Sequence, residues 1–125
     1  MENPSLTEKA KRIVEIFTRR GKKICVAESC TGGLVASSIV SISGASAVFL
    51  GSAVCYCDEA KMKILSVKKE ILEKYYAESL QCAQAMAHGA ISIFNADYAI
   101  ATTGFLDANV APKPADLAGK VFVCL

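Results

Sequence analysis

Four short apolar runs, separated by segments with helical spacing, constrain the fold of this chain more than any other feature. The runs are residues 24–27, 52–56, 98–101 and 119–125. An apolar run of this length without polar alternation is typical of a strand buried on both faces. Strands that alternate with helices form a largely parallel sheet covered on both sides. We therefore predict a single domain over residues 1–125 of the α/β class, a three-layer α/β/α sandwich with a largely parallel sheet.

The segments between the runs carry start and stop signals of helices. Ser5 and Glu8 form a capping-box pattern, and Gly21 follows the last turn as a stop. Gly32-Gly33 leads into a second helix, and Ser79 is a candidate cap for a long Ala-rich helix that ends at Phe94. Short helices are expected from residue 58 and over 68–76, and a long loop over 105–118.

Composition excludes several classes of function. The chain has 125 residues, 53% of them apolar, and a net charge of +2, so a large polyanionic partner is not expected. The dense basic stretch Arg19 to Lys23 is more typical of a helix C-terminus than of a nucleic-acid patch. No run is long and uniform enough to cross a bilayer.

Residues Met1 to Ser5 carry an acid and no apolar run, so no secretory signal is expected and a cytoplasmic location is predicted. The six cysteines should then be reduced thiols. They do not form paired CxxC units, and Cys55 and Cys57 would share one face of a strand. Packing in the core is the better interpretation than a metal site.

The last run, Val121 to Leu125, has no helix after it in this chain. A parallel strand needs cover on both faces. Either a partner chain supplies the cover, or residues that follow Leu125 are absent. We expect self-association into a dimer or larger homo-oligomer.

Polar residues follow three of the predicted strands, at 28–31, 56–58 and 102–104. Ligand sites of open α/β sheets lie at the carboxyl ends of strands. Ser29 lies between a strand and Gly32-Gly33, where a hydroxyl would be exposed and backbone amides could hold an anion or an oxyanion. The simpler alternative is that Ser29 or Thr31 only caps the next helix.

A serine nucleophile needs a base. His88, the only histidine, lies inside the Ala-rich helix, so a Ser-His-Asp triad is not expected. A lysine can serve when it is held neutral, which requires its pKa to fall from about 10.4 by roughly 3 units. Lys61, directly after the second strand, is the candidate, and Lys63 is its competitor. Cys30 is a rival nucleophile that would depend on the helix N-terminus alone for activation.

The stretch Ala27 to Gly33, AESCTGG, closely resembles the signature of the CinA C-terminal family. Residues 46–49, with Val54, Tyr56 and 59–61, are similar to further stretches of that family. Residues 96–100 with Thr103-Gly104 also resemble it, and the matches are collinear over most of the first 104 residues.

The resemblance implies a nicotinamide-nucleotide amidase, which converts nicotinamide mononucleotide and water to nicotinate mononucleotide and ammonia. It implies Ser29 as nucleophile, Lys61 as base and Thr103 as a polar group near them. No metal or organic cofactor is implied, and the partner is a small nucleotide. The substrate-binding residues that it implies are Cys30, Thr31, Gly32, Gly33, Tyr56 and Gly104.

The sequence also departs from the family pattern. The turn after Gly104 reads Phe105 to Ala111 without a second glycine, and Asp107 there would repel a phosphate. Asp58 replaces an asparagine, and the family's last strand and helix have no counterpart after Leu125. The alternative function is therefore a degenerate member that binds a nucleotide or partner without turnover. A nucleic-acid-binding module is a third, weaker hypothesis.

Overall fold

A computed structural model describes residues 2–107 and 119–125 of the chain. Its centre is a four-stranded sheet of order β2-β1-β3-β4. β1 pairs in parallel with β2 and with β3, whereas β4 pairs antiparallel with β3. The strands are β1 (Ile24–Glu28), β2 (Phe49–Val54), β3 (Tyr98–Phe105) and β4 (Lys120–Cys124).

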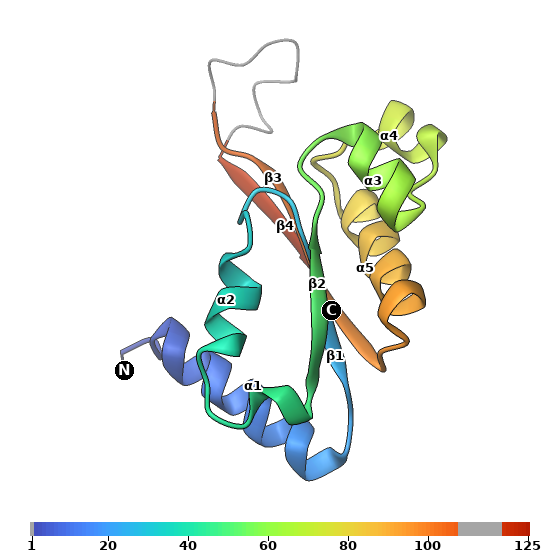
Figure 1. Ribbon diagram of the computed structural model, residues 1–125. Helices are drawn as coiled ribbons and strands as arrows, with labels where there is room; N and C mark the ends of the chain where they lie inside the picture. Colours follow the sequence, from blue (N-terminus) through green and yellow to red (C-terminus); the bar gives the residue numbers. More distant parts are fainter. Residues whose placement is uncertain (1, 108–118) are drawn as a thin grey trace.

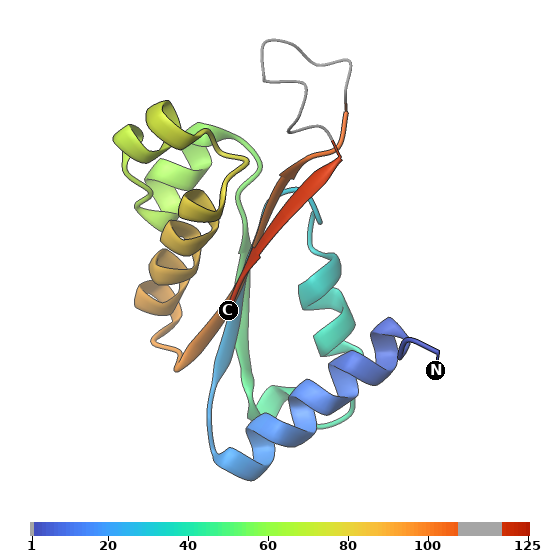
Figure 2. The same ribbon diagram turned by 180° about the vertical axis from the view of Figure 1, so that it is seen from behind.

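Helices cover both faces of the sheet, as Figures 1 and 2 show from opposite sides. α1 and α2 lie on one face, and α5 lies on the other with α3 and α4 at its upper end. The predicted three-layer sandwich with a mostly parallel sheet is confirmed. The helices are α1 (Leu6–Arg20), α2 (Leu34–Val40), α3 (Asp58–Leu65), α4 (Lys69–Tyr75) and α5 (Leu80–Phe94), with a 3₁₀ turn η1 (Ala45–Ala47) before β2.

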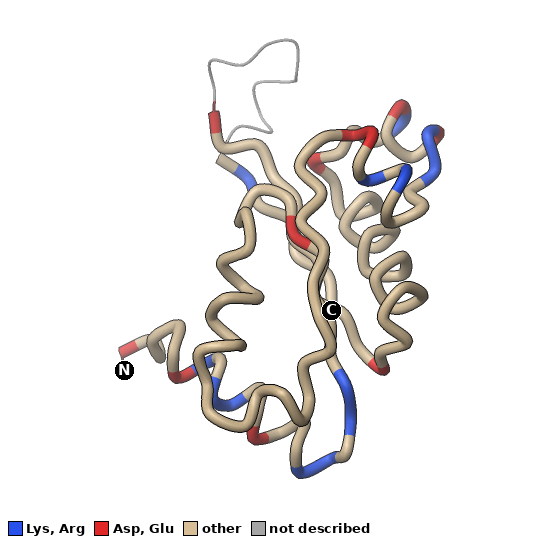
Figure 3. The backbone as a smooth tube through the Cα atoms, viewed as in Figure 1, with Lys and Arg blue, Asp and Glu red and all other residues tan. Residues whose placement is uncertain are grey.

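The predicted limits of α1 are confirmed in detail. The Ser5 side chain accepts from the Glu8 amide, and the Glu8 carboxylate accepts from the Ser5 amide. Gly21 ends the helix in the left-handed conformation with φ 62°, where a side chain would be strained. Arg19 and Arg20 lie in the last turn, at the negative end of the helix dipole. Figure 3 shows this basic group where α1 passes into β1.

The core consists of two apolar clusters, one on each face of β1. Alternate residues of the strand point to opposite faces, so Cys25 and Ala27 pack toward α5 while Val26 packs toward α1 and α2. All five residues of β1 are buried. β1 is therefore the fixed centre from which the residues after it are positioned.

Three predictions about strands need correction. β2 begins at Phe49 and ends at Val54, so Cys55 and Tyr56 follow the strand instead of ending it. β3 continues through Phe105, which was expected to open a loop. β4 runs antiparallel to β3, with Lys120 paired to Phe105 and Cys124 paired to Ala101. An antiparallel strand can leave one face in water, so the expected need for cover on both faces does not apply.

The strand order indicates where an open sheet of this kind can bind a ligand. The connection from β1 passes through α2 to β2 on one side, and the chain then crosses to β3 on the other side of β1. Neighbouring loops diverge at such a point, and a crevice forms beyond the carboxyl ends of β1 and β3. In the described part of the chain, no helix is long and apolar enough to cross a membrane.

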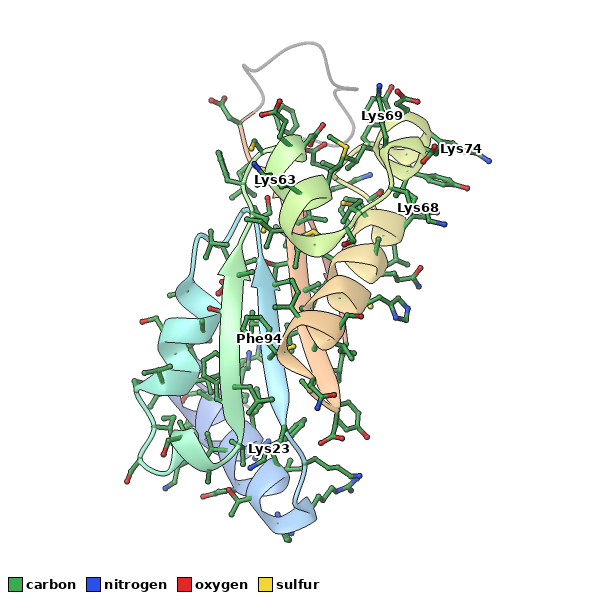
Figure 4. All side chains as sticks on the ribbon, turned by 45° about the vertical axis from the view of Figure 1, so that its right-hand side comes forward. Lys23, Lys63, Lys68, Lys69, Lys74 and Phe94 are labelled. Atoms are coloured by element: carbon green, nitrogen blue, oxygen red, sulfur yellow. The ribbon has the colours of Figure 1, made fainter. Side chains whose placement is uncertain are left out.

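Side chains of α5 fill the space against the sheet and against α3. The ring of Phe94 lies over β2 in Figure 4, and a Cβ on Gly51 would come within 2.6 Å of it. A Cβ on Gly89 would lie 1.9 Å from the backbone oxygen of Leu65, at the end of α3. The helix pair α3–α5 can therefore pack closely only with glycine at position 89.

We predict that Gly89→Ala destabilises the protein although alanine is the better helix former. The propensity gain is about 1 kcal/mol, whereas overpacking against backbone costs about 1 to 3 kcal/mol. Thermal unfolding followed by circular dichroism should show a lower midpoint. Ser92→Ala, at an exposed position of the same helix, is the control and should not lower it. Equal or higher stability of Gly89→Ala would contradict the packing argument.

Candidate functional site

Ser29 begins the turn that follows β1, and two backbone hydrogen bonds hold it. Its amide donates to the Thr102 carbonyl at 3.0 Å, and its carbonyl accepts from the Gly32 amide at 3.1 Å. The residue is 4% exposed. The first bond ties Ser29 to β3, so the position of its hydroxyl is set by the sheet.

Lys61 reaches this hydroxyl from α3. Its Nζ donates to Ser29 Oγ at 3.0 Å and to the Tyr56 carbonyl at 3.0 Å. Although lysine is rarely buried, the residue is only 1% exposed. The contact between a hydroxyl of the first loop and an amine after the second strand, expected from the sequence, is present in the structure.

The hydrogen bonds that Lys61 Nζ donates to Ser29 and Tyr56 go to uncharged groups. Among the described residues the one salt bridge is the exposed pair Lys69–Glu73, far along the chain from this site. The partners of Nζ are a hydroxyl and a carbonyl. Removing an amine from water is costly, and these two hydrogen bonds offset part of that cost.

A cavity of about 300 Å³ opens beside Ser29 at the carboxyl edge of the sheet. It brings together four of the residues predicted to form the site. The residues that line it are Ser29, Cys30, Tyr56, Glu78, Gly104, Phe105, Leu106 and Asp107. A hollow of about 460 Å³ between α3, α4 and α5 includes His88 and none of these residues. The only histidine of the chain thus lies in a different place from Ser29, as expected.

Of the glycines predicted for the site, Gly104 lines the cavity, whereas Gly32 and Gly33 lie in the turn after Ser29 and do not line it. Gly32 and Gly33 have φ of 62° and 109°, in the left-handed region that other residues rarely adopt. Gly104 lies within β3, and a Cβ on it would come within 2.6 Å of the Lys120 carbonyl and 3.2 Å of Cys30 Sγ. Gly104 is therefore required for the close approach of β4 and Cys30.

The N-terminus of α2 is not open to an anion, which corrects the sequence-based expectation. Gly33, the N-cap, provides no side-chain bond. The Glu28 carboxylate instead accepts from the amides of Val35 at 2.9 Å and Ala36 at 3.0 Å. Neither Ser29 nor Thr31 caps the helix. The cap is a buried acid at the end of β1, in the place that a bound phosphate would take.

Thr102 contacts the turn that begins at Ser29. Its hydroxyl lies 2.7 Å from Thr31 Oγ1, and its carbonyl accepts from the Ser29 amide. Thr103, the predicted polar group, has its side chain on the other face of β3, where it donates to the Ala77 carbonyl at 2.8 Å. Glu28 pairs with Thr102 in the parallel register of β1 and β3. Knowledge of this register would have identified Thr102 as the neighbour of the turn after β1.

Cys30 lies beside Ser29 but is a poor nucleophile. Burial raises the pKa of its thiol, against the opposing effects of nearby amides and of Lys61. A raised pKa means less thiolate at neutral pH. The expectation that Cys55 and Cys57 share a buried face is wrong: Cys55 is buried, whereas exposed Cys57 caps α3 through its sulfur. The described residues contain no cluster of three or more metal-binding side chains.

Part of the predicted substrate loop can be placed. Phe105 belongs to β3, and Leu106 and Asp107 line the cavity. The departures from the family pattern at residues 108–111 lie outside the described residues.

Fold and site together define an α/β protein with a buried serine–lysine pair at the carboxyl edge of an open sheet. The family model of the CinA C-terminal domain matches residues 6–125. A CinA-like protein of Syntrophomonas wolfei is 47% identical over 115 residues, which cover 90% of this chain and 27% of that protein. A CinA-like protein of Fervidobacterium nodosum is 46% identical over 92 residues, covering 74% of this chain and 22% of its own length.

Solved structures agree with this relationship. The crystal structure of the competence/damage inducible protein CihA from Agrobacterium tumefaciens is 40% identical and superposes with a TM-score of 0.85, covering 97% of this chain and 74% of that one. A competence or damage-inducible protein from Enterobacter asburiae gives a TM-score of 0.87 at 32% identity, over 95% and 74% of the two chains. This chain belongs to the CinA C-terminal domain family. It spans about a quarter of the length of the curated relatives named above.

We predict that iodoacetamide modifies Cys57 before Cys30 at pH 8. Cys57 is exposed, whereas the raised pKa of Cys30 keeps it in the thiol form. The rate at Cys30 should rise as the pH increases from 8, because its thiolate fraction increases. Peptide mass spectrometry gives both rates, and Cys57→Ser, which keeps a capping atom, removes the faster one. Faster reaction of Cys30 at neutral pH would contradict the assignment.

Proposed function

We propose that this domain hydrolyses the carboxamide of nicotinamide mononucleotide, with Ser29 as nucleophile and Lys61 as general base. The observation that carries the proposal is the 3.0 Å contact between Ser29 Oγ and Lys61 Nζ at the wall of a cavity. The family resemblance supplies the substrate, and the geometry supplies the chemistry. Hydroxyl and amine within hydrogen-bond distance are the arrangement that serine–lysine hydrolases use.

The contacts of Lys61 Nζ place it where the proposed base has to be. The Tyr56 carbonyl can only accept, so one N–H of Lys61 is directed to it. In the structure Nζ donates to Ser29 Oγ, and the catalytic step needs the reverse direction, in which the lone pair of a neutral amine accepts the hydroxyl proton. General base catalysis by lysine requires this neutral form.

Acylation follows from this arrangement. Ser29 Oγ attacks the carboxamide carbon as Lys61 takes the hydroxyl proton, and the carbonyl oxygen becomes an oxyanion. The Gly32 amide already donates to the Ser29 carbonyl, so we assign the oxyanion to other backbone amides of the turn. The C–N bond then breaks, Lys61 returns the proton to the nitrogen, and ammonia leaves.

Deacylation reverses the proton path. Water attacks the ester on Ser29 as Lys61 takes one of its protons, and the new C–O bond replaces the bond to Oγ. Lys61 then gives the proton back to Ser29, and nicotinate mononucleotide is released. No metal or organic cofactor enters these steps.

The cavity wall suits the ring of this substrate better than its phosphate. The lining carries two acids, Glu78 and Asp107, and the nicotinamide ring of the mononucleotide is a cationic pyridinium. Tyr56, 78% exposed at the rim, offers an aromatic face for such a ring. A phosphate beside Asp107 would be repelled, so we place the phosphate away from that residue.

Ammonia release from nicotinamide mononucleotide tests the mechanism. Ser29→Ala should lower kcat/KM by at least about 10³-fold, and Lys61→Met by about 10²- to 10⁴-fold. Lys63→Met, at an exposed position of α3, is the matched control and should keep the activity. Cys30→Ala tests the rival nucleophile and should retain turnover. Undiminished activity of Ser29→Ala would remove Ser29 from the mechanism.

The second candidate is a degenerate member that binds the nucleotide or another partner without turnover, which the absence of a second glycine in the turn after Gly104 favours. Calorimetric titration with the mononucleotide and with its nicotinate product separates the two functions. Hydrolysis together with binding supports the amidase. Binding of either compound with no ammonia release supports the degenerate member.

A further inference from the structure

Glu28 is the most deeply buried acid near the site, and its carboxylate is occupied by three donors. It is 0% exposed. It accepts from Val35 and Ala36 amides and from Thr31 Oγ1, the last at 2.6 Å. A carboxylate can be kept in the interior only with such partners. Its two amide contacts are explained by capping of α2, whereas the contact to Thr31 is not.

The direction of the hydrogen bonds beyond Glu28 can be derived from proton counting. A threonine hydroxyl has one proton, and Thr31 gives it to Glu28 Oε1. The 2.7 Å contact between Thr31 and Thr102 therefore has Thr102 as donor. The hydroxyls form one chain, from Thr102 through Thr31 to the carboxylate.

Thr102 also holds the nucleophile directly. Its carbonyl accepts from the Ser29 amide at 3.0 Å, while its hydroxyl is bound to Thr31, two residues further along the same turn. The turn is thus fixed to β3 at both Ser29 and Thr31. Glu28, the last residue of β1, binds the same turn from the other side through the Thr31 hydroxyl.

We propose that Glu28, Thr31 and Thr102 act as one positioning unit that keeps Ser29 Oγ in line with Lys61 and with the cavity. The inference rests on the role of Ser29 as nucleophile in the proposed function. None of the three side chains touches the reacting atoms, so they act as positioning groups. A misplacement of about 1 Å at a reacting group costs on the order of 10²-fold in rate, which gives the unit a measurable effect.

The test measures the reactivity of Ser29 itself, with a fluorophosphonate probe and peptide mass spectrometry. Thr102→Val removes the hydroxyl but keeps the backbone carbonyl and the shape of the side chain. We expect labelling of Ser29 to slow by about 10- to 100-fold in Thr102→Val and in Glu28→Gln. Thr102→Ser, which restores the donor, should label within about twofold of the unaltered protein. For hydrolysis of nicotinamide mononucleotide, kcat should fall while KM changes little.

Two further variants separate positioning from loss of stability. Ile39→Val removes a buried methyl group from α2 and destabilises the same helix without touching the hydroxyl chain. It should label at the unaltered rate. Thr31→Val combined with Thr102→Val should slow labelling no more than either alone, because both break one chain.

The outcomes are distinct. Unchanged labelling in folded Thr102→Val, equal slowing by Ile39→Val, or no labelling of Ser29 in the unaltered protein overturns the inference. If Glu28→Gln does not fold, Thr102→Val decides alone. Slowed labelling in a protein that releases no ammonia keeps the positioning unit and rejects the amidase.

Discussion

The hydrogen bond between Lys61 Nζ and Ser29 Oγ is the interaction on which the functional account depends. It joins α3 to the turn after β1, and both side chains are almost completely removed from solvent. Burying an amine is costly, so a fold would not keep it there for packing alone when an apolar side chain could fill the space. The contact has a chemical consequence: it turns a hydroxyl of low reactivity into a candidate nucleophile.

The rest of the structure serves to hold that contact in place. β1 is buried along its whole length and fixes the start of the turn, and β3 binds the turn through Thr102. Glu28 closes the N-terminus of α2, which leaves the oxyanion role to amides within the turn. Glu28 and Lys61 are both buried at the carboxyl edge of the sheet. Glu28 contacts α2 on one face, and Lys61 belongs to α3 on the other. Each is satisfied by its own set of neutral partners.

Much of this arrangement could be predicted from the sequence. The features that could not be predicted depend on contacts between segments that are distant in the sequence. Apolar runs and caps predicted the helices and all four strands, because local patterns determine them. An apolar run does not indicate the direction of a strand, so the antiparallel pairing of β4 with β3 could not be predicted from residues 119–125. The contact of Thr102 with the turn could not be predicted, because the pattern does not say which face a strand residue takes and register decides that. Glu28 was read only as a polar strand end, although the missing side-chain cap at Gly33 pointed to an acid from elsewhere.

The most direct test of the account is to find the covalent intermediate. The protein is mixed with nicotinamide mononucleotide, quenched in acid within one turnover, and digested for peptide mass spectrometry. The account predicts an ester on the peptide that contains Ser29, mapped to its hydroxyl and lost on longer incubation. An adduct mapped to Cys30, or hydrolysis that proceeds at full rate with no adduct on Ser29, would contradict it.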